Sequence, residues 1–300
     1  MKLAVPAQII KEYKNMRIAI ASGKGGTGKT TIAVNFAAYL DSLGVSVSFT
    51  DCDVEEPNAH FFLNPDLSAE KDEFLPVPAI DEQKCLGESC KKCIELCRFK
   101  SLIWMIDSVL SFSELCHGCG LCELACPADA IGEGQRLIGS SCSGKAGNID
   151  FSRGLLRIGE AMSPPLIKAV KDISPRAEVN ILDCPPGTSC PVVESIEGAD
   201  FVVLVTEPTP FGLHDLDLAV QLMGTLEMPC GVIVNRSGMG DDCVEKYLSD
   251  KNIPLLGSLP HSKEAASKYS EGGLLYESMP GFKDIFADIW SSIQKQVNGA

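Results

Sequence analysis

A glycine-rich segment near the start of the chain constrains the fold more than any other feature. The octapeptide GKGGTGKT at 23–30 follows a compact apolar run, Met16–Ala21, and precedes an amphipathic segment at 31–44 that ends in glycine. Its spacing fits G-x-x-x-x-G-K-T, and a position between a predicted strand and a predicted helix is the context in which this motif binds phosphate. With a second predicted strand at Val45–Phe49, this order predicts the beginning of a parallel α/β sheet.

The glycines of this loop have a physical role in the predicted site. Without Cβ atoms they let backbone N–H groups approach phosphate oxygens, and the helix N-terminus adds a partial positive charge. We expect Lys29 to reach the β- and γ-phosphates of a nucleotide and the Thr30 hydroxyl to bind Mg²⁺. A flexible glycine turn is the alternative. The predicted nucleotide-binding residues of the loop are Gly23, Gly25, Gly26, Thr27, Gly28, Lys29, Thr30 and Thr31.

The overall charge limits the choice of partners. The 300-residue chain has a formal net charge of −14, and 45% of its residues are hydrophobic, which is enough for a full core. Such a surface repels phosphate backbones and anionic lipids, so neither nucleic acid nor a membrane is expected as the main partner. No run approaches the ~18–20 apolar residues of a membrane helix, and we expect a cytoplasmic protein.

The cysteines gather in one part of the chain. Eight of the fourteen lie between Cys85 and Cys126. Because cytoplasmic thiols stay reduced, this grouping predicts metal ligands rather than disulfides. The second group, C-x2-C-x2-C-x3-C-P at 116–127, has the spacing of bacterial ferredoxins and predicts a 4Fe–4S cluster rather than zinc. The first group departs from it, with four residues after Cys85 and an arginine after Cys97.

Crossed ligation, in which the last cysteine of each group serves the other cluster, predicts two 4Fe–4S clusters. The first set is Cys85, Cys90, Cys93 and Cys126, and the second set is Cys97, Cys116, Cys119 and Cys122. The irregular first group leaves a three-iron or otherwise altered site open. A segment of about 50 residues buries too little apolar surface to order itself, so we expect metal binding to order it.

The run KGGTGKT at 24–30 resembles the deviant Walker A motif of the superfamily that contains MinD, ParA, Mrp and the nitrogenase iron protein. The resemblance implies that Lys24 crosses a dimer interface to the partner's nucleotide. It also implies that ATP joins two subunits, as a homodimer or as a heterodimer with a paralogue. A solvated loop charge is the alternative for Lys24.

Two further segments resemble the switches of that superfamily. In the first, DCD at 51–53, the likeness implies that Asp53 orients the attacking water and that Asp51 supports Mg²⁺, although either could cap a turn. In the second, DCPPGT at 183–188, it implies that Asp183 holds a magnesium-bound water and that Gly187 meets the γ-phosphate. Carboxylates at the ends of parallel strands lie beside the phosphate loop, which supports this assignment.

The same resemblance implies contacts outside the switches. Asn235 and Pro260 would contact the adenine base. Cys190 lies seven residues after Asp183, where the nitrogenase iron protein places a ligand of its intersubunit cluster. A shared third cluster, with Cys142 as its conceivable second ligand, is one interpretation, and a packing or redox-active thiol is the other. We expect buried or semi-buried thiols at Cys52, Cys142, Cys184, Cys230 and Cys243.

Taken whole, the chain resembles MinD-superfamily ATPases that contain an inserted ferredoxin domain. The expected fold is a mostly parallel P-loop α/β sheet flanked by helices, formed by 1–81 and 132–300, with a small α+β ferredoxin-like insert at 82–131. Residues 132–162 are interpreted as the return path from the insert.

The resemblance implies slow, partner-stimulated hydrolysis of ATP to ADP by a protein with Mg²⁺ and two 4Fe–4S clusters. Its partner would be a redox or metallocluster-assembly protein, so that ATP controls electron transfer or cluster assembly. The alternative is a positioning ATPase of the ParA/MinD type, in which the clusters are structural or sense redox state.

Overall fold

The computed structural model describes residues 15–298. The first fourteen residues and the last two, which the sequence assigns to the ATPase domain, lie outside this range. Within it, no helix is both long enough and apolar enough to cross a membrane.

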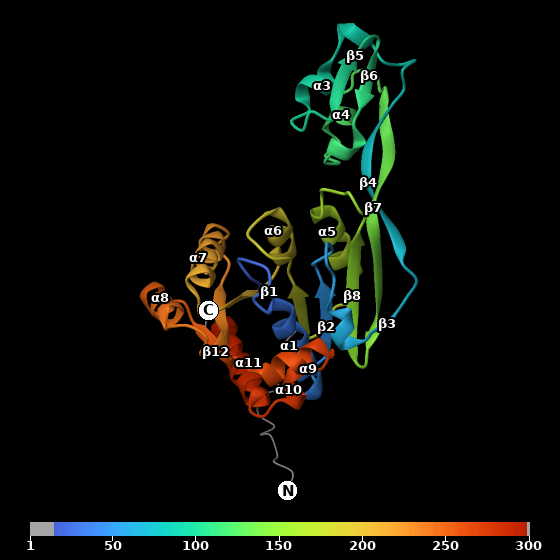
Figure 1. Ribbon diagram of the computed structural model, residues 1–300. Helices are drawn as coiled ribbons and strands as arrows, with labels where there is room; N and C mark the ends of the chain where they lie inside the picture. The colour runs from blue at the N-terminus through green and yellow to red at the C-terminus, as the bar shows by residue number, and fades with distance from the viewer. Residues whose placement is uncertain (1–14, 299–300) are drawn as a thin grey trace.

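A ten-stranded sheet forms the centre of the molecule, in the order β12-β11-β10-β1-β9-β2-β8-β7-β3, with β4 also paired to β7 (Figure 1). The strands from β12 to β8 run parallel, and β7 joins them antiparallel. The parallel strands are β1 (Met16–Ala21), β2 (Val47–Asp51), β8 (Ile149–Leu156), β9 (Val179–Asp183), β10 (Phe201–Thr206), β11 (Cys230–Ser237) and β12 (Leu255–Pro260). The predicted fold class, a mostly parallel sheet flanked by helices, is confirmed.

Helices cover both faces of the sheet because its central strands are apolar on both sides. Along β1, Ile18 and Ile20 enter one hydrophobic core, while Ala19 and Ala21 enter the other. The first core contains side chains of α1 (Lys29–Ser42), α2 (His60–Leu63), α9 (Lys263–Ser270), α10 (Leu275–Ser278) and α11 (Phe282–Asn298). The second contains side chains of α5 (Pro164–Ile173), α6 (Cys190–Ile196), α7 (Pro210–Thr225) and α8 (Cys243–Lys251).

Residues 132–162, interpreted as the return path from the insert, do lead back from it and also form part of the central sheet. This stretch forms most of β7 (Ile131–Ala146) and all of β8, and both belong to the central sheet. The aromatic ring of Phe151 on β8 stacks on Phe49 of β2, with ring centroids 5.6 Å apart. The many glycines and serines of β7 have low strand propensity, so its pairing with β8 depends on tertiary context.

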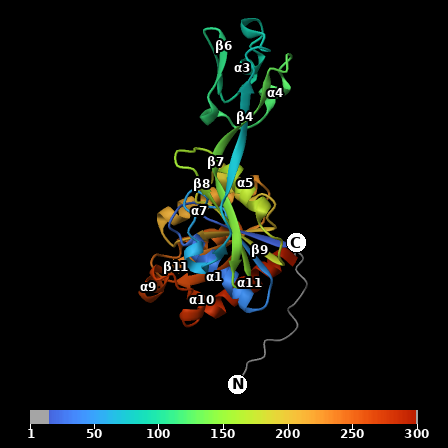
Figure 2. The same ribbon diagram turned by 90° about the vertical axis from the view of Figure 1, so that its right-hand side faces the viewer.

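Two long strands carry the cysteine-rich segment away from the sheet (Figures 1 and 2). β4 (Lys71–Ile80) pairs antiparallel with β7, from Lys71 opposite Ser141 to Ile80 opposite Ile131. The short strand β3 (Asp66–Leu67) pairs with the other end of β7. We call β4 and β7 together the ribbon.

Residues 81–130, which we call the lobe, form a separate unit at the end of the ribbon (Figure 2). It has its own two-stranded sheet of β5 (Leu102–Met105) and β6 (Ser108–Ser111). Around this sheet lie α3 (Lys92–Leu96), α4 (Leu121–Leu124) and two 3-10 turns, η1 (Gly87–Ser89) and η2 (Ser113–Leu115). All eight clustered cysteines lie in this lobe.

Candidate functional site

The glycine-rich loop joins β1 to α1 at the carboxyl edge of the sheet. Gly28 has φ 90° and lies directly before α1, a left-handed conformation that glycine adopts without a Cβ clash. A Cβ atom there would also lie 2.2 Å from Nδ2 of Asn235. That amide donates a hydrogen bond of 2.7 Å to the Thr27 carbonyl oxygen. Asn235, predicted as an adenine contact, therefore also supports the loop from β11.

The first turn of α1 holds the other predicted phosphate-binding side chains. Lys29 and Thr30 are buried there, and Thr31 follows them in the helix. The Oγ1 atom of Thr27 is buried without a hydrogen-bond partner among the described residues. A buried hydroxyl of the glycine-rich loop that has no protein partner suits a hydrogen bond to a polar ligand.

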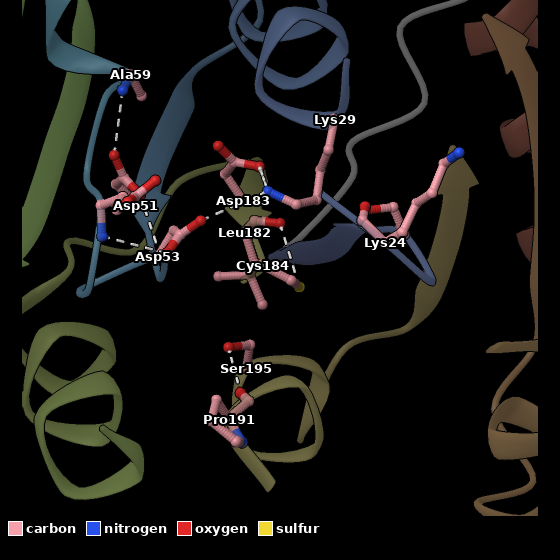
Figure 3. A network of polar contacts seen from close by, with 12 residues as sticks. Lys24, Lys29, Asp51, Asp53, Ala59, Leu182, Asp183, Cys184, Pro191 and Ser195 are labelled. Carbon is pink, nitrogen blue, oxygen red and sulfur yellow. Dashed lines mark hydrogen bonds and ion pairs between the residues drawn. The ribbon is translucent and has the colours of Figure 1, made fainter. Parts of the chain in front are cut away.

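Two acidic side chains end neighbouring strands next to this loop (Figure 3). Asp51 of β2 pairs in register with Asp183 of β9, so both lie at the same edge. The Lys29 ammonium is 3.4 Å from Asp183 Oδ1 and 4.0 Å from Asp53 Oδ2. The structure thus brings one cation and three predicted catalytic or metal-binding carboxylates together.

Burial changes the protonation of these groups. It raises the pKa of Asp51 well above its ordinary value, and the nearby Asp183 charge adds to the rise, while a hydrogen bond from the Ala59 N–H opposes it. For Asp53, burial outweighs the attraction of Lys29 and raises the pKa to about 6. For Lys29, burial lowers the pKa, but the neighbouring carboxylates outweigh it and raise the pKa above its ordinary value.

The acidic cluster fits a magnesium ion in its chemistry. Carboxylate and hydroxyl oxygens are the ligands that Mg²⁺ prefers, usually with several waters retained. Oδ2 of Asp183 is buried with no hydrogen-bond partner among the described residues, which leaves an acceptor for a bound water. Within residues 15–298, no group of three or more His, Cys, Asp or Glu side chains converges as a ready-made cage for one ion. A magnesium held by few protein ligands and a nucleotide phosphate needs no such cage.

Lys24 points away from the acidic cluster (Figure 3). Its ammonium lies 3.6 Å from Oε2 of Glu207, which also pairs with Arg236. Sequence reasoning missed Glu207, because nothing in the segment after β10 marks it as the partner of a loop lysine 183 positions away. This ion pair holds the lysine within its own chain in the structure described.

The other predicted nucleotide contacts include Gly187, Gly23 and Pro260. Gly187 has φ 100°, and its N–H donates to the Ser22 carbonyl oxygen at 2.9 Å, so the second switch segment touches the start of the loop. Gly23 packs so closely on Asp215 that a Cβ atom would lie 2.1 Å from its carbonyl oxygen. Pro260 is exposed at the end of β12.

The match to known proteins agrees with this arrangement of loop and strand ends. Residues 18–275 match the model of the CobQ/CobB/MinD/ParA nucleotide binding domain. The chain belongs to this family. An uncharacterized protein of Methanocaldococcus jannaschii is 30% identical, with 86% of this chain and 90% of that protein covered. An iron-sulfur cluster carrier protein of Pyrococcus horikoshii is 27% identical, with 92% and 86% covered.

Solved structures show the same fold. MinD of Pyrococcus horikoshii, determined in complex with Mg-ADP, superposes with a TM-score of 0.59 at 18% identity, and the match covers 93% of this chain and 96% of that one. The family whose model matches this chain is a family of nucleotide-binding domains, and the matched range includes the glycine-rich loop.

The lobe contains two separate cavities, and each is lined by four cysteines. One cavity is bordered by Cys97, Cys116, Cys119 and Cys122, and the other by Cys85, Cys90, Cys93 and Cys126. These are the two sets that crossed ligation groups together. All eight are free thiols in the structure, so no disulfide competes for them. Each thiolate of a 4Fe–4S cube binds a different iron, which spreads the four sulfurs further apart than the ligands of one ion.

Backbone groups around these cavities suit thiolate ligands. The N–H of Gly118 donates to Cys116 Sγ at 3.4 Å, and that of Ala130 donates to Cys126 Sγ at 3.3 Å. Hydrogen bonds to the sulfurs are a main influence on cluster potential. His117 stacks on Phe99 with ring centroids 3.6 Å apart. The donor set and its surroundings fit two 4Fe–4S clusters.

The other cysteines lie in the nucleotide-binding domain. As predicted, Cys52, Cys142 and Cys184 are buried, and Cys230 and Cys243 are half-buried. Cys190 is exposed at the first position of α6, whereas Cys142 is 4% exposed within β7. A strand position this buried makes Cys142 a poor ligand for a cluster shared between subunits.

Proposed function

We propose that this protein is an ATP-hydrolysing iron–sulfur protein in which a nucleotide-driven change in a dimer controls electron transfer or the assembly of metalloclusters. One observation carries the proposal: two cavities, each lined by four cysteines, lie on a lobe whose ribbon continues into the nucleotide-binding sheet.

The nucleotide half of the proposal rests on the residues at the carboxyl edge of the sheet. The loop N–H groups and the α1 N-terminus bind the phosphates, and Lys29 neutralises the charge between the β- and γ-phosphates. Thr30, Asp51 and Asp183 hold Mg²⁺ directly or through water, as their burial and the unpaired Asp183 oxygen support. Asp53 orients the attacking water, and its pKa of about 6 leaves it mostly ionised at neutral pH.

Dimer formation is proposed through Lys24. Its side chain is 31% exposed, whereas that of its partner Glu207 is 12% exposed, so Lys24 is the more accessible member of the pair. When ATP binds, Lys24 exchanges Glu207 for the nucleotide of a second subunit, which is either the same chain or a paralogue. Because Lys24 then binds the nucleotide of the second subunit, closure of the dimer depends on the γ-phosphate.

The lobe supplies the iron–sulfur half. Cys85, Cys90, Cys93 and Cys126 hold one 4Fe–4S cluster, and Cys97, Cys116, Cys119 and Cys122 hold the other. When bound, such clusters supply one-electron redox chemistry. The relatives named as iron-sulfur cluster carriers support a function in cluster assembly or delivery to a partner protein. Cys190 remains available at the surface as a ligand of a shared cluster or as a redox-active thiol.

A positioning ATPase is the second candidate, favoured only by the likeness of fold to MinD. The net charge of −14 disfavours binding to nucleic acid or to anionic membranes, on which positioning depends. Binding to liposomes or DNA that strengthens with ATP would support this candidate instead.

Iron counting and electron paramagnetic resonance of anaerobically purified protein test the proposal. We expect about eight iron atoms per chain, or about ten if a third cluster is shared, and reduced-cluster signals that change when ATP is added. A shift in signal without iron loss indicates electron gating, and ATP-dependent transfer of iron to an apo acceptor indicates delivery. A colourless, iron-poor preparation that hydrolyses ATP normally contradicts the proposal.

A further inference from the structure

A buried ion pair lies where the lobe meets the nucleotide-binding domain. The side chains of Arg136, on the ribbon, and Glu160, in the segment before α5, are 4% and 0% exposed and lie 3.2 Å apart. Two charges buried this deeply are costly unless they are paired and hydrogen-bonded, so their other contacts show what the pair holds in place.

On the lobe side, Arg136 reaches the backbone that leads into a cysteine set. Its Nη1 donates to the carbonyl oxygen of Ser113, and the same oxygen accepts from the N–H of Cys116 at 3.0 Å. Glu114, the next residue, pairs with Arg157 at 2.9 Å. The position of Cys116 therefore depends on the guanidinium of Arg136.

On the nucleotide side, Glu160 orders the segment that touches the first switch. Its Oε1 accepts from the N–H of Met162 at 3.0 Å. The next residue, Ser163, is 2% exposed and donates from Oγ to Glu55 Oε1 at 3.0 Å. Glu55 stands two positions after Asp53, whose Oδ1 accepts from the following N–H of Glu56 at 3.4 Å.

The four charges at this junction can pair in more than one way. Arg157 lies 3.7 Å from Glu160 as well as near Glu114, and Arg136 lies 3.9 Å from Glu114. In the part of the chain that the structure describes, Oε2 of Glu160 and the Nε atoms of both arginines are buried without hydrogen-bond partners. Each arginine lies near both glutamates, and unpaired donors and an acceptor remain. A small displacement of these side chains would therefore let them form a different set of ion pairs.

The junction is also next to one cysteine cavity and not the other. The cavity of the Cys116 set is bordered by Pro76, Val77 and Pro78 of the ribbon, whereas the other is bordered by Ile80 and Ile131 at the ribbon's far end. The loop of the Cys116 set packs on the same part of the ribbon, since a Cβ at Gly118 would lie 2.8 Å from Leu75.

We propose that Arg136, Glu160 and Ser163 are positioning residues that couple the Asp53 switch to the cluster held by the Cys116 set. This inference rests on the proposed function, because it names the route by which nucleotide and cluster influence each other. Movement of the switch shifts Glu55 and Ser163, the segment 160–163 moves with them, and Arg136 changes its hold on Ser113. On this route, the Cys116 set is the one that responds to nucleotide.

Two variants test the route without leaving a lone buried charge. Arg136→Met with Glu160→Met removes both partners of the ion pair and keeps similar volume. Ser163→Ala removes the hydroxyl that reaches the switch and leaves the ion pair intact. Lys145→Met is the matched control, because Lys145 lies on β7 as Arg136 does but pairs with Asp150, outside the junction.

The measurement is the ratio of nucleotide affinities with the clusters oxidised and reduced, using Mg-AMPPNP and anaerobic holoprotein. Linkage requires that nucleotide binding change the equilibrium constant for cluster reduction by the same factor. A redox titration followed by electron paramagnetic resonance reports this change as a shift in cluster potential. We expect a ratio of about 5-fold or more in the wild type and in Lys145→Met, and less than about 2-fold in the other two variants. Hydrogen exchange of the 113–118 backbone should respond to Mg-AMPPNP in the wild type and in Lys145→Met, and should not respond in the other two variants.

The outcomes separate the two proposals. A wild-type ratio of about one contradicts the coupling on which the proposed function depends. The route is overturned if the wild type shows the expected ratio, both variants retain it, and their exchange at 113–118 still responds to Mg-AMPPNP as in the wild type. That result leaves the proposed function standing. If the double variant fails to fold, Ser163→Ala alone decides the question.

Discussion

The nucleotide-binding domain and the lobe differ in what holds them together. The sheet buries apolar strands on both faces, and the first of its two cores contains large side chains such as Phe36, Phe49 and Phe286 at 0–1% exposure. In the lobe, the buried hydrophobic side chains are Leu102, Val109, Cys116 and Ala130. Larger ones, among them Ile106 at 91% and Leu124 at 87%, are exposed. The first unit is therefore held by hydrophobic burial, and we predict that the second depends on metal bound by its cysteines.

Iron removal should produce the largest difference between the lobe and the nucleotide-binding domain. We expect anaerobic chelation to unfold residues 81–130 while the nucleotide-binding domain keeps its structure and its affinity for Mg-ATP, because metal binding supplies the ordering energy of a small module. Limited proteolysis with mass spectrometry would show cleavage confined to the lobe. Protein handled in the same way but left with its iron is the control, and a protease-resistant lobe in iron-free protein would refute the expectation.

A core substitution tests the other half of the comparison. Phe49→Ala removes a fully buried ring stacked on Phe151, so the free energy of unfolding of the nucleotide-binding domain should fall by about 3–5 kcal/mol. The matched lobe variant, Leu124→Ala, changes an exposed side chain and should alter stability by less than about 0.5 kcal/mol. Urea unfolding followed by circular dichroism measures both, and similar losses would mean that the lobe has an apolar core after all.

Substitution of Lys29 should impair the nucleotide-binding domain and leave the lobe unaffected. Lys29→Ala should slow ATP hydrolysis by about 100-fold, because a charge fixed beside the phosphates is lost. Iron content should stay unchanged, since Lys29 lies in α1 and not in the lobe. Lys71→Ala, which removes an exposed lysine paired with Glu73, is the control. Loss of iron in Lys29→Ala would show that nucleotide binding is needed to fill the lobe.

The smallest effect concerns pH and Asp53 in protein free of nucleotide and metal. The folded-state pKa of about 6 lies above the ordinary 3.8, so folded protein binds this proton more tightly than unfolded protein does. The stabilising contribution is therefore full below about pH 4 and is lost as pH rises to about 6. Asp53→Asn should unfold like the wild type at pH 4 and be more stable by about 1–3 kcal/mol above pH 6.5. An equal difference at both pH values would mean that titration of Asp53 is not the cause.

Local patterns were sufficient to predict much of this protein. The glycine loop between β1 and α1, the carboxylates at the ends of β2 and β9 and the cysteine spacings each depend on residues close together in the chain. Their chemistry is set by short-range geometry: positive φ at glycine, the shared edge of parallel strands and the reach of a thiolate. The fold class followed from the same signals.

Only the tertiary structure decided how distant segments meet. β7 lacks a clear strand pattern, yet it joins the sheet to the lobe because β4 and β8 pair with its two ends. No sequence pattern marks Glu207 as the partner of Lys24 or Glu160 as the partner of Arg136, and each pairing arises where separate strands and loops bring opposite charges together. Such contacts depend on packing between elements far apart in the sequence, which local propensity does not encode.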